Sequence, residues 1–178
     1  MARKISLREF QQGVAERLRD AASRTTVLSR LGFRVGEQNW LVNLADVSEV
    51  IPVPNLVAVP MTLPWYRGVT NIRGKLYSIA DFAAYQGHAP TGPGTERRVI
   101  LIGEKLIEGS GFVVSRMLGL HNPAQFTAEV LDSHAARPWI AGSYRDGGGT
   151  RWYELDLVGL TRDTRFLEVG SLTAVPAA

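Results

Sequence analysis

The chain has 178 residues, of which 45% are hydrophobic and 21% charged, and a chain of this length can bury the core of a domain that folds independently. It has no cysteine, no run of 18 apolar residues and no charged-then-apolar leader, so disulfides and thiolate chemistry are excluded and we expect a soluble, cytoplasmic protein. The net charge of +3 comes entirely from residues 1–24, with six basic and three acidic side chains, because residues 25–178 carry 14 of each sign.

Residues 1–24 are predicted to form an N-terminal helical segment ahead of one domain over residues 25–178. Ser6 and Glu9 have the spacing of a capping box. Apolar residues then recur every three or four positions, at Leu7, Phe10, Val14 and Leu18. Such a helix either covers an apolar edge of its own domain, which we favour, or docks to a partner.

The first part of the domain has the pattern of a β-hairpin. Residues 31–35 alternate, the turn signal 36–39 follows, and residues 40–44 resume an apolar run. Asp46 then predicts a capped helical turn over residues 47–50. Four prolines keep the chain extended and irregular as far as residue 64.

Further strands follow along the chain. A second hairpin is predicted over residues 68–79, and a turn-rich stretch over 86–95 separates it from two buried strands at 99–102 and 112–114. A last strand is predicted over 152–157, and the tail after it has the apolar spacing of a short helix. Many short strands with close turns indicate a mainly all-β fold, a small barrel or a pair of barrels.

The motifs of several enzyme classes are missing. There is no G-x-S-x-G elbow, and the one glycine-lysine pair is followed by Leu76 rather than by serine or threonine. His88, His121 and His134 lack the i, i+4 spacing of a helical metal site and are interpreted as surface or turn residues. We therefore predict no catalytic residue, no cofactor and no metal.

Asp81 has two interpretations, one catalytic and one structural. It stands at the end of a predicted strand, where it could act as a general base, but it also precedes a turn over residues 82–85 that it could cap, and we favour the cap. A hydrolase would need Asp81 and a second carboxylate to cluster with His121 or His134.

The segment from Glu49 to Asp81 has the composition of a protein-binding patch. Trp65 and Tyr66 are adjacent aromatics near two arginines, one of them Arg73, within a proline- and glycine-rich stretch. The structural alternatives are that Trp65 plugs a barrel end and that Arg73 pairs with Glu49.

The residues of this segment resemble the CheW family of chemosensory adaptors. The family pattern G-V-x-N-[LI]-R-G, then an apolar strand and an aspartate, stands here as residues 68–74 followed by Leu76, Ile79 and Asp81. The similarity runs from about residue 31 to 167 and is closest to the adaptors of type IV pilus, or twitching-motility, systems. The aspartate that the family usually carries after its next strand is replaced by Ser115.

The resemblance implies two intertwined five-stranded SH3-like barrels, no enzymatic activity, and coupling of a methyl-accepting chemoreceptor to a CheA-type histidine kinase at membrane receptor arrays. It implies no binding of nucleic acid and no direct membrane insertion. Combined with the composition, it predicts partner-binding residues at Val47, Glu49, Trp65, Tyr66, Asn71 and Arg73. The alternative function is a small-barrel nucleic-acid binder with a basic arm formed by Arg17, Arg19 and Arg24.

Overall fold

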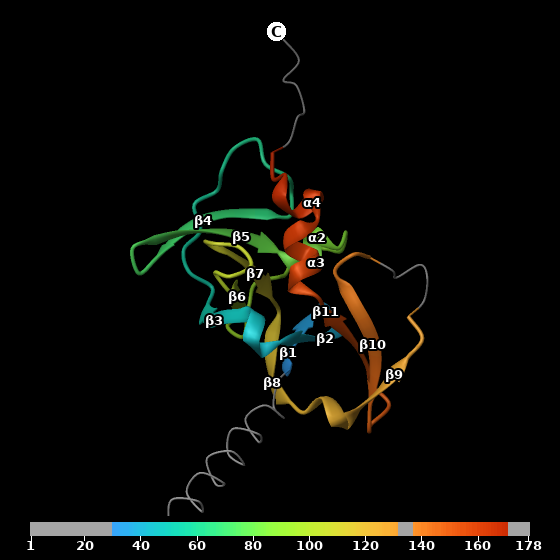
Figure 1. Cartoon of the computed structure of the whole chain (residues 1–178). Helices are drawn as coiled ribbons and strands as arrows, with labels where there is room; N and C mark the ends of the chain where they lie inside the picture. The colour runs from blue at the N-terminus through green and yellow to red at the C-terminus, as the bar shows by residue number, and fades with distance from the viewer. Residues whose placement is uncertain (1–29, 132–136, 171–178) are drawn as a thin grey trace, which may run out of the picture.

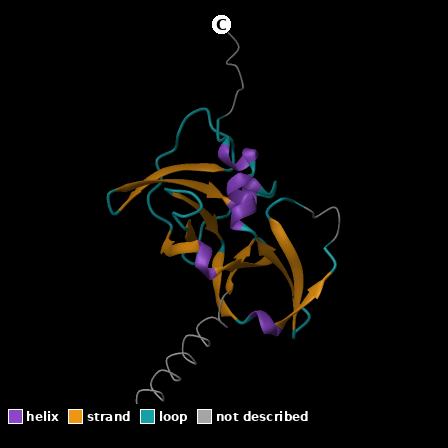
Figure 2. Ribbon diagram, in the orientation of Figure 1, coloured by secondary structure: helices purple, strands orange, loops and turns teal. Residues whose placement is uncertain are grey.

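The computed structural model describes residues 30–131 and 137–170 (Figure 1). The helix and the basic arm expected within residues 1–24, and His134, lie outside the described residues. Strands dominate the described part, and the helices are short (Figure 2).

The described residues form eleven strands and three α-helices. The strands are β1 (Arg30–Val35), β2 (Gln38–Asn43), β3 (Val47–Pro52), β4 (Tyr66–Ile72), β5 (Lys75–Asp81), β6 (Arg98–Ile102), β7 (Ser110–Val114), β8 (Arg116–His121), β9 (Phe126–Glu129), β10 (Ile140–Asp146) and β11 (Arg151–Leu155). The helices are α2 (Phe82–Tyr85), α3 (Leu157–Arg162) and α4 (Thr164–Leu167), and 3-10 turns η1 (Leu44–Asp46) and η2 (Pro123–Gln125) lie between strands.

The strands form two sheets that the chain enters in an interleaved order. The first sheet has the strand order β8-β1-β2-β11-β10-β9, and the second has the order β3-β6-β7-β5-β4. From residue 30 onward the chain therefore starts in the first sheet, builds the whole second sheet, and returns to complete the first. Parallel pairing of β11 with β2 joins the late strands to the early ones.

The mainly-β fold with two interleaved sheets is confirmed, and one sheet is larger than the family resemblance implied. The first sheet has six strands instead of five, because the chain turns at η2 after β8 and adds β9 beside β10. The predicted strands did not include β8, β9 or β10, whose residues are mostly half-buried or exposed. Such strands lack the apolar run or regular alternation that a sequence pattern detects.

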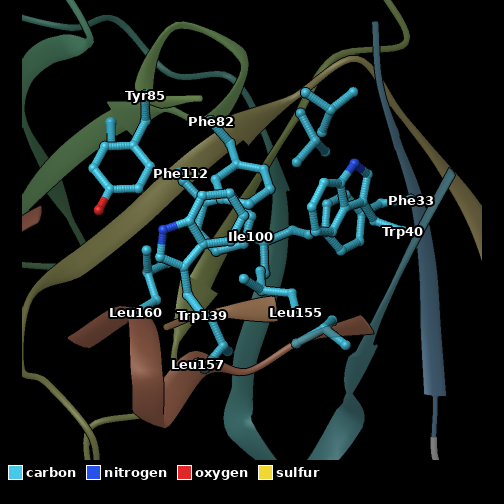
Figure 3. Close-up of a cluster of buried hydrophobic side chains, with 14 of the residues drawn as sticks. Phe33, Trp40, Phe82, Tyr85, Ile100, Phe112, Trp139, Leu155, Leu157 and Leu160 are labelled. Atoms are coloured by element: carbon cyan, nitrogen blue, oxygen red, sulfur yellow. The ribbon is translucent and has the colours of Figure 1, made fainter. Parts of the chain in front are cut away.

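One core lies between the two sheets (Figure 3). Phe33 and Trp40 of the first sheet pack against Phe82 of α2 and Phe112 of the second sheet. A smaller cluster lies on the opposite face of the second sheet and contains Tyr77, Ile79, Val99, Leu101 and Val113. Because successive side chains of a strand point to opposite faces, β6 and β7 supply both clusters, which explains their continuous apolar runs.

Two local predictions are wrong. Residues 47–50 form β3 rather than a helical turn, because antiparallel pairing with β6 fixes them in an extended conformation. The last strand was predicted over residues 152–157 but ends at Leu155. Asp156 instead caps α3 and accepts a hydrogen bond from the backbone N–H of Val158. The tail prediction is confirmed, since α3 and α4 follow.

Candidate docking surface

The turn between β4 and β5 carries a long charged side chain at a position that favours asparagine, aspartate or glycine. Ile72 pairs with Lys75, so Arg73 and Gly74 form a two-residue loop with φ of +53° and +86°. Two positive φ angles are the pattern of a type I′ turn, which favours asparagine and glycine. A residue with a Cβ is strained there by about 1–2 kcal/mol, and backbone strain of this kind is common at functional sites.

Arg73 reaches from this turn to the far edge of the same sheet. Its Nη1 and Nη2 donate to the two carboxylate oxygens of Glu49 at 2.8 and 2.7 Å. Glu49 belongs to β3, and β3 and β4 are the opposite edge strands of the second sheet. The bidentate pair therefore bridges the two edges of the curved sheet, and we call Glu49 and Arg73 the clasp.

The clasp is too exposed to serve mainly as a source of stability. The Arg73 side chain is 77% exposed and that of Glu49 is 33% exposed. Exposed ion pairs contribute about 0–1 kcal/mol, less than the strain of the turn. Its physical effect is to fix the direction of a solvent-facing guanidinium, whose remaining donors can meet a partner.

Neighbouring residues hold the turn in place. The side-chain oxygen of Asn71 accepts a hydrogen bond of 2.9 Å from the backbone N–H of Gly74. On the following strand, Lys75 is paired with Glu104 at 2.6 Å, and hydrogen bonding to that carboxylate raises the pKa of Lys75. Asn71 thus fixes the turn from within, and Lys75 ties the hairpin to the segment after β6.

The six residues predicted for partner binding do not form one patch. Glu49, Asn71 and Arg73 gather around the turn, and Val47 lies on the same edge strand as Glu49 but packs its side chain against the main core. Trp65 and Tyr66 lie at the other end of β4, about 20 Å along a seven-residue strand.

Trp65 is half-buried and packs against two other aromatic rings. Its ring stacks on Phe166 of α4 with centroids 6.0 Å apart and meets the edge of Tyr85 at 5.2 Å. Tyr66 is half-buried and donates its hydroxyl hydrogen to Ser78 at 3.1 Å. Trp65 therefore attaches α4 to the second sheet, while the hydrogen bond of Tyr66 stays within that sheet.

Three exposed apolar side chains, one beside the clasp and two in the loop before β4, were missed in the sequence. Leu76, directly across from Asn71, is 66% exposed, and Val57 and Met61 in the loop before β4 are 66% and 68% exposed. Leu76 could have been found, because Tyr77 and Ile79 alternate inward and place it on the outer face. Val57 and Met61 lie in irregular chain, where no periodicity predicts a face.

Asp81 is a helix cap, as favoured from the sequence. The side chain, in a residue only 1% exposed, accepts hydrogen bonds from the backbone of Ala83 and Ala84, and both the backbone and hydroxyl of Thr91. It thereby ties α2 to the loop that follows. With four donors on its two oxygens, the carboxylate has little capacity left for a general base.

The described histidines do not form a catalytic or metal site. His121 packs its ring against Phe126 and Trp152, and His88 is exposed after α2. Within residues 30–131 and 137–170, no group of three or more histidine, aspartate or glutamate side chains is placed to hold a metal ion.

Ser115, which replaces an expected aspartate, joins the two sheets. Its backbone N–H donates to the carbonyl of Arg34 at 2.9 Å, and its hydroxyl accepts from the backbone N–H of Gly36 at 3.2 Å. The residue thus has a structural contact with the β1–β2 hairpin.

A hydrogen-bonded pair anchors α4 on the body of the protein. The hydroxyl of Tyr85 donates to Asp163 at 2.8 Å, and Asp163 also caps α4 and pairs with Arg165. Hydrogen bonds from Arg165 and Tyr85 lower the pKa of Asp163, while burial, followed by the bond to Asp163, raises the pKa of Tyr85.

These shifts predict a loss of stability in acid. Because the folded pKa of Asp163 lies below its ordinary value of about 3.9, its contribution is present at neutral pH and disappears as the pH falls through that lowered pKa. Asp163→Asn should lower the free energy of unfolding by roughly 1 kcal/mol at pH 7. The difference in free energy of unfolding between variant and parent should become smaller as the pH falls to about 3. Urea titrations at several pH values measure it, with the exposed Glu96→Gln as control. A gap that is independent of pH would contradict the assignment.

No helix within the described ranges is long and apolar enough to cross a membrane.

Comparisons with known proteins agree on one family. The model of the CheW-like domain matches residues 30–165. Protein PilI of Pseudomonas aeruginosa is 30% identical over 119 residues, 65% of this chain and 66% of its own length. The probable chemotaxis protein CheW of Rhizobium etli is 35% identical over 74 residues, which is 42% of this chain and 47% of that protein. The aligned part thus spans less than two thirds of either relative.

A solved structure has the same fold. The scaffolding protein TtCheW from Thermoanaerobacter tengcongensis superposes with a TM-score of 0.61 at 16% identity, covering 71% of this chain and 86% of that one. The match of the family model over residues 30–165 confirms the family resemblance stated from the sequence motif.

Proposed function

This chain belongs to the CheW family, and from that premise we propose that it is a non-catalytic adaptor that couples a methyl-accepting chemoreceptor to a CheA-type histidine kinase. The observation that carries the proposal is the clasp, a strained and solvent-exposed turn whose guanidinium is held in one direction. A group arranged in this way suits recognition of a partner better than chemistry on a substrate.

The two sheets supply two surfaces for two partners. The hairpin turn, with Glu49, Asn71 and Arg73, would form or support the receptor side, flanked by the exposed apolar side chain of Leu76. An exposed apolar residue beside a fixed charge suits the apolar stripe and polar flank of a helical hairpin. A separate sheet edge would meet the homologous domain of the kinase.

The signalling system proposed is the one that controls type IV pilus twitching motility. The 30% identity to PilI of Pseudomonas aeruginosa supports this choice. We place the adaptor at membrane receptor arrays through its receptor contact, without insertion of its own chain.

Reconstitution tests the proposal directly. Purified chain, a CheA-type kinase and a receptor cytoplasmic fragment are mixed, and autophosphorylation of the kinase is followed with radiolabelled ATP. We expect receptor-dependent change in the phosphorylation rate only when the chain is present, because an adaptor acts through differences of affinity. Equal rates with and without the chain, at concentrations where the kinase binds receptor arrays, would contradict the proposal.

A further inference from the structure

A pocket lies on the second sheet where α4 packs against the start of β4 (Figure 1). It is open to solvent and encloses about 510 Å³. Its walls are mostly apolar and are formed by Trp65, Ile107, Phe166, Leu167 and Val169. Neither residue of the clasp lines it, so it is separate from the docking surface.

Two serine side chains belong to this pocket. Ser78 of β5 and Ser110 of β7 are partners in the parallel pairing of these strands, and both line the pocket. Paired residues of neighbouring strands lie about 5 Å apart and point to the same face of the sheet. Ile79, which follows Ser78, points into the smaller cluster on the other face. Both serine hydroxyls therefore lie on the face that carries the pocket.

The hydroxyl of Ser110 is unpaired although the residue is buried. Ser110 is 6% exposed, and its hydroxyl has no hydrogen-bond partner among the described residues. Its oxygen is nevertheless accessible to solvent, and the pocket is the opening on that face. A hydroxyl in an apolar site is unfavourable without a partner, and a molecule in the pocket would supply one.

Ser78 is a second donor beside Ser110. Its oxygen accepts a hydrogen bond of 3.1 Å from the hydroxyl of Tyr66, so its own hydroxyl hydrogen remains for another acceptor. Two hydroxyl donors on adjacent strands suit one acceptor oxygen placed between them.

The charge of the lining favours a neutral oxygen. Glu108 is the one charged side chain among the described residues that line the pocket. An anion would therefore meet a like charge with no cation to balance it. A cation would leave both hydroxyl hydrogens without an acceptor. A neutral hydroxyl or carbonyl oxygen suits the two donors, and the apolar walls suit an attached ring or chain.

We propose that this pocket binds a small neutral molecule with a hydroxyl or carbonyl oxygen on an apolar body, and that Ser78 and Ser110 donate hydrogen bonds to that oxygen. The inference goes beyond the adaptor function and does not depend on it. It also gives a role to the end of β4, where two of the residues predicted for partner binding, Trp65 and Tyr66, line the pocket.

The chain provides its own reporter for the test. Its four tryptophans give four indole N–H signals in a ¹⁵N-labelled sample of the full chain, and Trp65→Phe identifies the signal from the pocket. Titration with benzyl alcohol should shift the Trp65 signal with saturation, while the signal of Trp152, whose N–H donates to Asp146, stays in place. Toluene, which lacks the oxygen, should bind about tenfold more weakly. Benzoate and benzylamine carry charged groups on the same ring and should also bind more weakly than the alcohol.

A variant pair checks the serine donor. Ser110→Ala should weaken the binding of benzyl alcohol about fivefold to tenfold without weakening that of toluene, because only the alcohol uses the hydroxyl. Ser48→Ala, at an exposed position of β3 outside the pocket, should leave the binding of both probes unchanged. The proposal would be overturned by the absence of a saturable shift, by equal binding of benzyl alcohol and toluene, or by equal or tighter binding of a charged probe. Unchanged binding of the alcohol by Ser110→Ala would overturn it as well.

Discussion

Gly68→Ala is expected to destabilise the protein by roughly 3 kcal/mol or more. Gly68 has φ of +118°, and a Cβ built there would lie 2.1 Å from the carbonyl oxygen of Val57. The overlap is with backbone rather than with a flexible side chain. Alanine would therefore force apart the two hydrogen bonds that join Val57 and Val69 at 2.8 and 2.9 Å, in addition to straining its own backbone.

A second glycine separates conformational strain from the close approach. Gly36 in the β1–β2 turn also has a positive φ, +56°, but no atom lies within 4 Å of a Cβ built there. Gly36→Ala should lower the free energy of unfolding by only about 1 kcal/mol. Chemical denaturation monitored by tryptophan fluorescence measures both variants. Equal losses of free energy of unfolding in the two variants would show that the close approach of the loop to β4 is not the reason why residue 68 must be glycine.

Arg73→Glu is expected to abolish assembly with the receptor fragment and the kinase while the protein stays folded. The change replaces the clasp by two like charges and removes the exposed guanidinium, but the ion pair is largely solvated, so the free energy of unfolding should change by about 1 kcal/mol or less. Circular dichroism reports the fold, and sedimentation with receptor arrays reports assembly. Normal assembly of the folded variant would contradict the placement of the docking surface.

Two further variants distinguish the clasp from the exposed arginine itself. Arg73→Asn puts the most favoured residue pair into the type I′ turn, so the protein should be at least as stable as its parent and still fail to assemble. Combining Arg73→Glu with Glu49→Arg restores an ion pair of reversed direction. If the partner binds the guanidinium on the turn, the double variant still fails to assemble with the receptor fragment and the kinase. If only an ion pair between the two sheet edges is needed, the double variant recovers assembly.

Local patterns predicted those elements whose residues carry their own signal. The hairpins around Gly36 and Gly74 were found because a glycine turn lies between alternating residues, and both are present. The apolar runs of β6 and β7 were correctly interpreted as buried strands. The cap at Asp81 was correctly favoured over a general base, since its spacing to the following turn is local.

Predictions failed where a distant segment determines the conformation. Asp46 and Glu49 have the spacing of a capped helical turn, yet pairing of Glu49 with Leu101 makes the segment a strand. The strands β8 to β10 have weak patterns and form because β1, β9 and β11 offer pairing edges. Loop closure over such separations depends on the whole fold, which no local window contains.

The amino-acid sequence alone determined the family, the mainly-β class and the motif that holds Asn71, Arg73 and Gly74 together, because each rests on residue identity and short spacing. Only the tertiary structure decided that Arg73 meets Glu49 across the sheet, that Trp65 contacts α4, and that Arg137 donates a hydrogen bond to the backbone carbonyl of Gln86. These contacts depend on the curvature of the second sheet and on the return of the chain to the first. Side chains far apart in sequence become neighbours only when the sheets have packed.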